Sequence, residues 1–112
     1  MDKITDEYMQ SMLATIRPYC IVLLKPAGNV PPENIRQIIW EHGRRNFALR
    51  NEGKIAIVCP VSKEADVAGL YIFNSAPEEV AEIMKADPAV EAGIFTFHIY
   101  PCMSFPGDSL GK

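Results

Sequence analysis

The spacing of apolar residues along the chain predicts four β-strands and three α-helices. Continuous or alternating apolar runs favour strands over residues 19–25, 55–61, 69–73 and 94–100. Apolar residues at helical spacing favour helices over residues 3–16, 33–51 and about 75–85. The polar segment 62–66 predicts a turn, so the second and third strands are expected to form a hairpin.

Prolines and cap residues mark the ends of these elements. Pro18 precedes the first strand, and Pro101 is expected to stop the last one, because proline has no backbone N–H to donate to a neighbouring strand. Ser75, followed three residues later by Glu78, predicts a capping box at the start of the last helix.

The resulting order is β-α-β-β-α-β after a short N-terminal helix. It predicts the α+β class and a ferredoxin-like fold, in which two helices cover one face of a four-stranded antiparallel sheet. The last strand offers bulky side chains to both faces, since Phe97 and Ile99 alternate with His98 and Tyr100. A chain of this size has little left to cover the second face. We therefore expect a homodimer that packs sheet on sheet, a dimeric α/β barrel. The leading helix has a thin apolar stripe and is expected to pack on the domain.

Composition and charge limit the class of protein and agree with this architecture. The 112 residues form a single domain by length, and 48% hydrophobic with 22% charged residues is ordinary globular usage. A net charge of −3 without a basic cluster disfavours nucleic acid as a partner. No apolar run approaches the ~20 residues of a membrane span, and no signal-peptide core is present, so a cytoplasmic protein is expected. The widely spaced Cys20, Cys59 and Cys102 are expected to be free thiols, the first two buried in strands.

Two ionisable residues stand where apolar residues are expected. His42 follows Ile38 by four residues on the apolar stripe of the long helix, and Asn46 lies one turn further. Asp87 continues the stripe of the last helix, four residues after Ile83. Burying one ionised group alone is costly, whereas a carboxylate beside an imidazole satisfies both. Such a pair fixes which ring nitrogen carries the proton and can act as a general acid or base.

Structural explanations stay open beside this one. A histidine on a helix stripe is often a hydrogen-bonded core residue, and Asp87, which precedes Pro88, can cap a short turn. His98 is expected on a sheet face or at the dimer interface. Trp40 and Phe47 form a separate apolar edge, suited to packing or a dimer contact. With two histidines and no H-x-x-E-H or similar spacing, neither a metal nor another cofactor is expected.

A resemblance to the YCII-related family is carried by two segments, HGRRNFALRNEGKIAIVCP (42–60) and ADPAVEAGIFTFHIYP (86–101). Members typically show a helix histidine, a later Glu-Gly or similar pair, a strand ending in Gly-Pro, and Asp-Pro before the last strand. Here these features correspond to His42, Glu52-Gly53, Cys59-Pro60 and Asp87-Pro88. The likeness spans about residues 18–101. The leading helix (1–17) and the tail (102–112) lie outside it.

The resemblance implies a dimeric α/β barrel with His42 and Asp87 as its active-site pair. Related members include a dehydrochlorinase that acts on chlorinated hydroxyquinols, while most members have no assigned substrate. Cys59 replaces the usual glycine before Pro60, which is expected to narrow the pocket at that strand end. The leading helix and the tail are candidates for a lid over the site or for an extension of the dimer contact.

These expectations describe an enzyme-like site for a small oxygenated compound, aromatic compounds included. His42 would transfer a proton in an elimination or isomerisation, Asp87 would orient the imidazole, and Asn46 would hydrogen-bond the substrate. Such a protein would be a lyase or isomerase that needs no metal. The rival is a non-catalytic dimeric module that binds a small ligand and keeps the pair as buried structure. A third alternative is a structural pair without a pocket.

Overall fold

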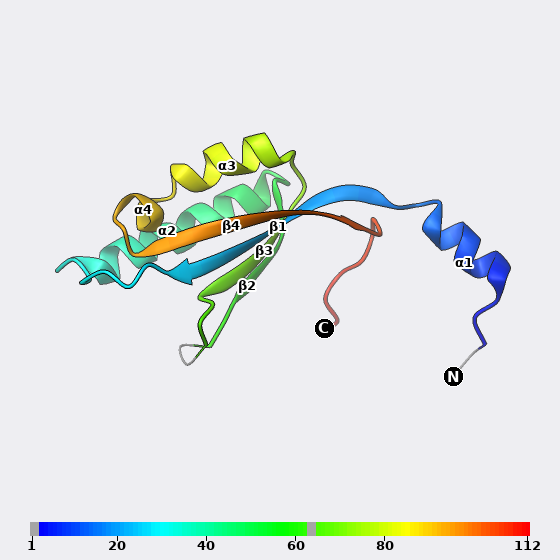
Figure 1. Cartoon of the computed structure of the whole chain (residues 1–112), viewed down its shortest axis with the longest axis horizontal. Helices are drawn as coiled ribbons and strands as arrows, with labels where there is room; N and C mark the ends of the chain where they lie inside the picture. Colours follow the sequence, from blue (N-terminus) through cyan, green and yellow to red (C-terminus); the bar gives the residue numbers. More distant parts are fainter. Residues whose placement is uncertain (1–2, 63–64) are drawn as a thin grey trace.

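The computed structural model describes residues 3–62 and 65–112. Its elements follow in the order α1 (Asp6–Leu13), β1 (Arg17–Pro26), α2 (Ile35–Asn51), β2 (Ile55–Pro60), β3 (Gly69–Phe73), α3 (Pro77–Lys85), α4 (Pro88–Glu91) and β4 (Phe95–Ser104). Helices α2, α3 and α4 lie on one side of the sheet, while α1 stands beyond its end (Figure 1). No helix in the described ranges has the length and apolar character to cross a membrane.

The strands form one antiparallel sheet in the order β2-β3-β1-β4. Strand β1 pairs with β3 on one side and with β4 on the other, and β2 pairs with β3 as a hairpin. This arrangement confirms the predicted ferredoxin-like α+β fold. The predicted turn at 62–66 includes residues 63 and 64, which lie outside the described residues.

The core lies between the sheet and the helices. Alternate residues along the middle of β1 and along β3 point toward the helices and are buried, because side chains alternate between the two faces of a strand. Helix α3 adds an apolar face to the same cluster. The buried set comprises Cys20, Val22, Leu24, Ile55, Tyr71, Phe73, Val80 and Met84.

The opposite face of the sheet is also apolar. Ile21 lies beside Ile72 and Leu23 beside Leu70 across the β1–β3 pair, and all four side chains are only half-buried. Cys59, the neighbour of Leu70 on β2, is exposed on this face, so the prediction that Cys59 is buried is wrong. A surface of this kind can bury more apolar area if another molecule covers it.

Strand β4 does not stop at Pro101, contrary to the sequence prediction. The strand runs to Ser104, and Pro101 pairs with Cys20 of β1. Since β4 is an edge strand of the sheet, its outward-facing positions need no ladder hydrogen bond, and proline is tolerated there.

The predicted capping box at Ser75 is not formed. Helix α3 begins at Pro77, and its N-cap, Ala76, makes no side-chain capping bond. Proline suits this first helical position because its ring presets the backbone angle and it has no N–H to satisfy. The Ser75 carbonyl instead accepts a hydrogen bond from the Cys20 thiol at 3.4 Å.

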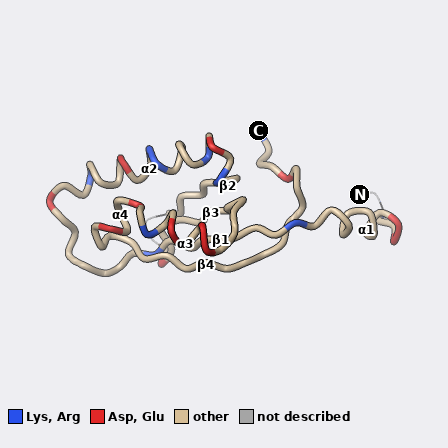
Figure 2. The backbone as a smooth tube through the Cα atoms, turned by 90° about the horizontal axis from the view of Figure 1, so that it is seen from above, with Lys and Arg blue, Asp and Glu red and all other residues tan. Residues whose placement is uncertain are grey.

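Helix α1 does not pack on the sheet or its helices, contrary to expectation. The Thr5 hydroxyl caps it by accepting from the Tyr8 N–H at 3.1 Å. Seven of its residues are exposed and Met12 is half-buried. Seen from above, α1 lies far from the helical layer (Figure 2).

Replacing Phe73 with alanine tests the assignment of the core. Phe73 is fully buried, so Phe73→Ala is expected to lower the free energy of unfolding by about 3–5 kcal/mol in urea denaturation. Val30→Ala is the control, because Val30 is 92% exposed and its loss should change stability by only ~0.5 kcal/mol or less. Equal effects would contradict the assigned core.

Candidate active site

The residues singled out by the sequence meet at one place under the helices. His42 and Asn46 project from consecutive turns of α2, and each is 8% exposed. Asp87 is 1% exposed and is the N-cap of α4. It therefore follows α3, which ends at Lys85, and does not continue its apolar stripe as predicted. The structure adds Tyr71, whose side chain rises from β3.

His42 and Asp87 form a close buried pair. The Nδ1 atom of His42 lies 2.8 Å from Oδ1 and 2.9 Å from Oδ2 of Asp87. A carboxylate accepts hydrogen bonds, so Nδ1 carries a proton, and in the neutral form of the ring Nε2 is the acceptor.

Asp87 serves the backbone as well as the imidazole. Its Oδ2 accepts from the N–H of Ala89 at 3.0 Å and from the N–H of Val90 at 3.2 Å. Arg45 places a guanidinium nitrogen 3.9 Å from Oδ1. The capping explanation and the pairing explanation of Asp87 are therefore both correct.

A second set of hydrogen bonds reaches the other side of the imidazole. The hydroxyl oxygen of Tyr71 lies 3.1 Å from His42 Nε2, and Asn46 Nδ2 donates to that hydroxyl at 3.1 Å. Since Nε2 accepts, Tyr71 is the donor to it. Within residues 3–62 and 65–112, every buried side-chain nitrogen or oxygen has a hydrogen-bond partner.

The Tyr71 hydroxyl remains protonated over the whole physiological range. Burial raises the pKa of Tyr71 to about 12, the hydrogen bond from Asn46 works against that rise, and the negative charge of Asp87 adds to it. Tyr71 is therefore a fixed neutral donor at the floor of the site.

A cavity of about 270 Å³ opens beside these groups. Its polar end is formed by His42, Asn46 and Tyr71. The Phe95 ring tilts against the imidazole with 5.5 Å between ring centroids. Gly69 leaves part of the wall without a side chain. The rest of the lining is mainly apolar and consists of Leu24, Ile39, Gly43, Phe47, Val58, Pro60 and Ala68.

Tyr71 is the site residue that the sequence analysis missed. Alternation in the segment 69–73 places Tyr71 on the same face as Phe73, and a buried tyrosine hydroxyl usually needs a hydrogen-bond partner. The alternation thus indicates a buried tyrosine hydroxyl, but it does not identify the residue that hydrogen-bonds to it.

His98 lies apart from the site on the opposite sheet face and is exposed. In the described part of the chain, no three His, Cys, Asp or Glu side chains cluster in a way that could hold a metal ion.

Replacing Tyr71 with phenylalanine tests the buried phenol. A pKa raised from about 10 to about 12 means that the folded state keeps the proton longer, so this stabilisation is present below pH 10 and is lost as the pH rises to 12. The free energy of unfolding should fall by about 2–3 kcal/mol more in the wild type than in Tyr71→Phe over that interval. Urea titrations at several pH values measure this, and parallel curves for the two proteins would refute it.

Comparisons with known proteins give a likeness in structure. No protein-family model matches the sequence, and no curated protein is significantly similar to it in sequence. A similar solved structure is 5-chloro-2-hydroxyhydroquinone dehydrochlorinase (TftG) from Burkholderia phenoliruptrix AC1100 in complex with 2,5-dihydroxybenzoquinone. The match has a TM-score of 0.52 and 18% sequence identity, and covers 73% of this chain and 90% of that chain. This chain therefore shares the fold of that dehydrochlorinase.

Proposed function

We propose that this protein is a YCII-like enzyme that transfers protons with its His42–Asp87 pair during an elimination or isomerisation. The observation that carries the proposal is the position of His42. Its Nδ1 is bound by a buried carboxylate, and the imidazole lines a mainly apolar cavity. A base held in this way is oriented before the substrate arrives.

In the proposed reaction, each site residue has a separate role. His42 Nε2 accepts a proton from an acidic hydroxyl or C–H of the substrate, and Asp87 stabilises the resulting imidazolium. The electron pair released on the substrate then expels a leaving group in an elimination. In an isomerisation, the imidazolium returns the proton at another atom. Asn46 and Tyr71 supply the donors for a substrate oxygen, once ligand binding draws the Tyr71 hydroxyl away from Nε2.

The substrate class we propose is a single-ring hydroxyquinol, hydroxyquinone or similar oxygenated compound. An apolar cavity of about 150 Å³ holds one benzene molecule, so 270 Å³ suits one substituted ring. The three polar groups at one end match oxygens on one side of such a ring. The fold shared with a dehydrochlorinase solved with 2,5-dihydroxybenzoquinone supports this choice.

We also propose that this protein is cytoplasmic. The three cysteines of this chain are free, which suits the cytoplasm, where thiols stay reduced.

Conservative substitutions of the pair test this function. In a screen of hydroxyquinols and chlorinated hydroxyquinols followed by absorbance, His42→Gln and Asp87→Asn should each lower turnover by about 10²–10⁴-fold. Asparagine can still cap α4 through its side-chain oxygen, which keeps the fold. The control is His98→Gln, the same change at the exposed histidine.

The same assay distinguishes an enzyme from a ligand-binding module. Full turnover in both variants would exclude proton transfer by this pair. If a compound binds but is never converted, and His42→Leu binds it unchanged, the protein is a ligand-binding module. If no compound of this class binds, the proposed substrate class is wrong.

We also propose that two copies pack through the open sheet face. The half-buried Ile21, Leu23, Leu70 and Ile72 form the centre of this contact. Light scattering after size exclusion should give a dimer for the wild type and a weaker dimer, which dissociates at higher protein concentration, for Leu23→Asp. Val30→Asp, in an exposed loop, should remain dimeric. A monomeric wild type, or a Leu23→Asp dimer as tight as that of the wild type, would rule out this interface.

A further inference from the structure

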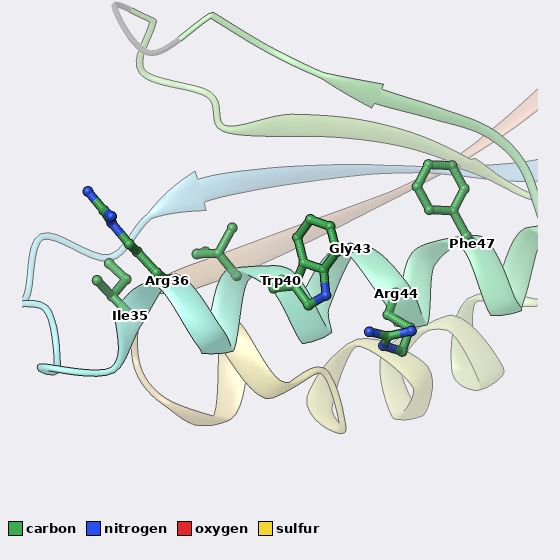
Figure 3. Close-up of a pocket in the computed structure, with 7 residues that line it drawn as sticks. Ile35, Arg36, Trp40, Gly43, Arg44 and Phe47 are labelled. Carbon is green, nitrogen blue, oxygen red and sulfur yellow. The ribbon is translucent and has the colours of Figure 1, made fainter.

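An apolar groove of about 750 Å³ runs along the solvent-facing side of α2. Ile35, Trp40 and Phe47 lie along this side of the helix, with Arg36 and Arg44 beside them (Figure 3). Trp40 is 67% exposed and Phe47 is 56% exposed. Large aromatic side chains exposed together on one helix face are typical of a surface that binds another protein segment.

Gly43 lies in the middle of this groove. A glycine inside a helix costs about 1 kcal/mol relative to alanine. Nothing in the described chain lies within 4 Å of the Cβ that another residue would place there. The missing side chain therefore relieves no crowding within the chain itself, and it lets a second helix approach α2 closely.

Helix α1 has the surface that such a groove requires. Tyr8, Met9 and Leu13 lie on one side of it and are each about half exposed, at 51%, 48% and 51%. Its first turn carries Asp6 and Glu7, opposite in charge to Arg36 beside the groove, whereas Arg44 is already paired with Glu41 at 3.1 Å. An amphipathic helix in an apolar groove, with acidic groups facing basic ones, is a common mode of recognition.

The helix does not reach this groove in its own chain. Ala14 and Thr15 are held in a hydrogen-bonded turn, since their N–H groups donate to the carbonyls of Gln10 and Met12. Strand β1 begins two residues later and is paired with β4 from Arg17 onward. This connection directs α1 away from α2 (Figures 1 and 2).

We propose that α1 docks in the α2 groove of a second copy of this chain. An exchange of helices between two copies uses the same two surfaces twice and closes on itself. Ile39, Gly43 and Phe47 line both the groove and the His42 cavity. The partner's helix thus lies against the mouth of the site and forms part of its wall. This contact does not depend on any reaction at His42.

Trp40 is the only tryptophan of the chain and reports directly on this contact. In the wild type, docking should shift Trp40 emission to shorter wavelength and weaken its quenching by acrylamide. Tyr8→Gln with Leu13→Gln removes the apolar side of α1 but keeps good helix formers, so emission should shift back and quenching should rise. Gln10→Ala, on the other side of α1, should behave as the wild type. Equal quenching in the wild type and the double variant would overturn the proposal.

A mixing experiment identifies which copy supplies the helix. The double variant is refolded with an excess of Trp40→Phe, which has an intact α1 and no tryptophan. Docking between copies predicts that Trp40 of the double variant becomes shielded again. Trp40→Phe that also carries Tyr8→Gln and Leu13→Gln should give no shielding. If the excess of intact α1 restores nothing, the helix docks on its own chain or elsewhere, and the proposal fails. Circular dichroism confirms that each variant is folded.

Discussion

The contact between His42 and the Asp87 carboxylate is the interaction on which the rest of the site depends. The imidazole belongs to α2, while the carboxylate stands at the junction between α3 and α4. The same carboxylate closes the start of α4 by accepting two backbone N–H groups. One buried carboxylate therefore caps a helix and orients an imidazole. The helix that Asp87 caps is followed by β4, whose first residue, Phe95, lies against the imidazole.

The polar groups of the site are hydrogen-bonded to one another. Asp87 sets the imidazole tautomer, Tyr71 donates to the free ring nitrogen, and Asn46 donates to Tyr71. A fully satisfied buried network holds its members in one geometry more firmly than separate pairs would. The network lies beside a mainly apolar wall, where a low local dielectric strengthens electrostatic interactions.

Much of the fold was predictable because it follows from local patterns. Alternation and helical spacing located the strands and helices, and the stripe of α2 placed His42 and Asn46 inward. Pro101 was misjudged because a proline is tolerated in an edge strand, and strand order is not a local property. The exact place of Asp87, outside α3, depended on where that helix ends.

The remaining features depend on contacts between distant segments. Tyr71 meets His42 only through the packing of α2 on β3, which no single segment encodes. Cys59 is exposed because it lies on the sheet face opposite the helices, which no other described part of the single chain covers at this residue. Helix α1 has a thin apolar stripe, and such a stripe does not say whether the helix packs on its own chain, which it does not.

A substitution at Gly69 would change the size of the cavity. It lines the cavity, and a Cβ placed there would lie 3.6 Å from the carbonyl oxygen of Cys59 and 3.9 Å from Leu24, both ordinary van der Waals distances. Its backbone angles are also open to other residues, since Gly69 is not among the glycines with positive φ. A side chain at this position would reduce the room for a ring while leaving the groups proposed to transfer protons untouched. In the proposed reaction, selectivity among compounds of different size can therefore diverge at one position, separately from proton transfer.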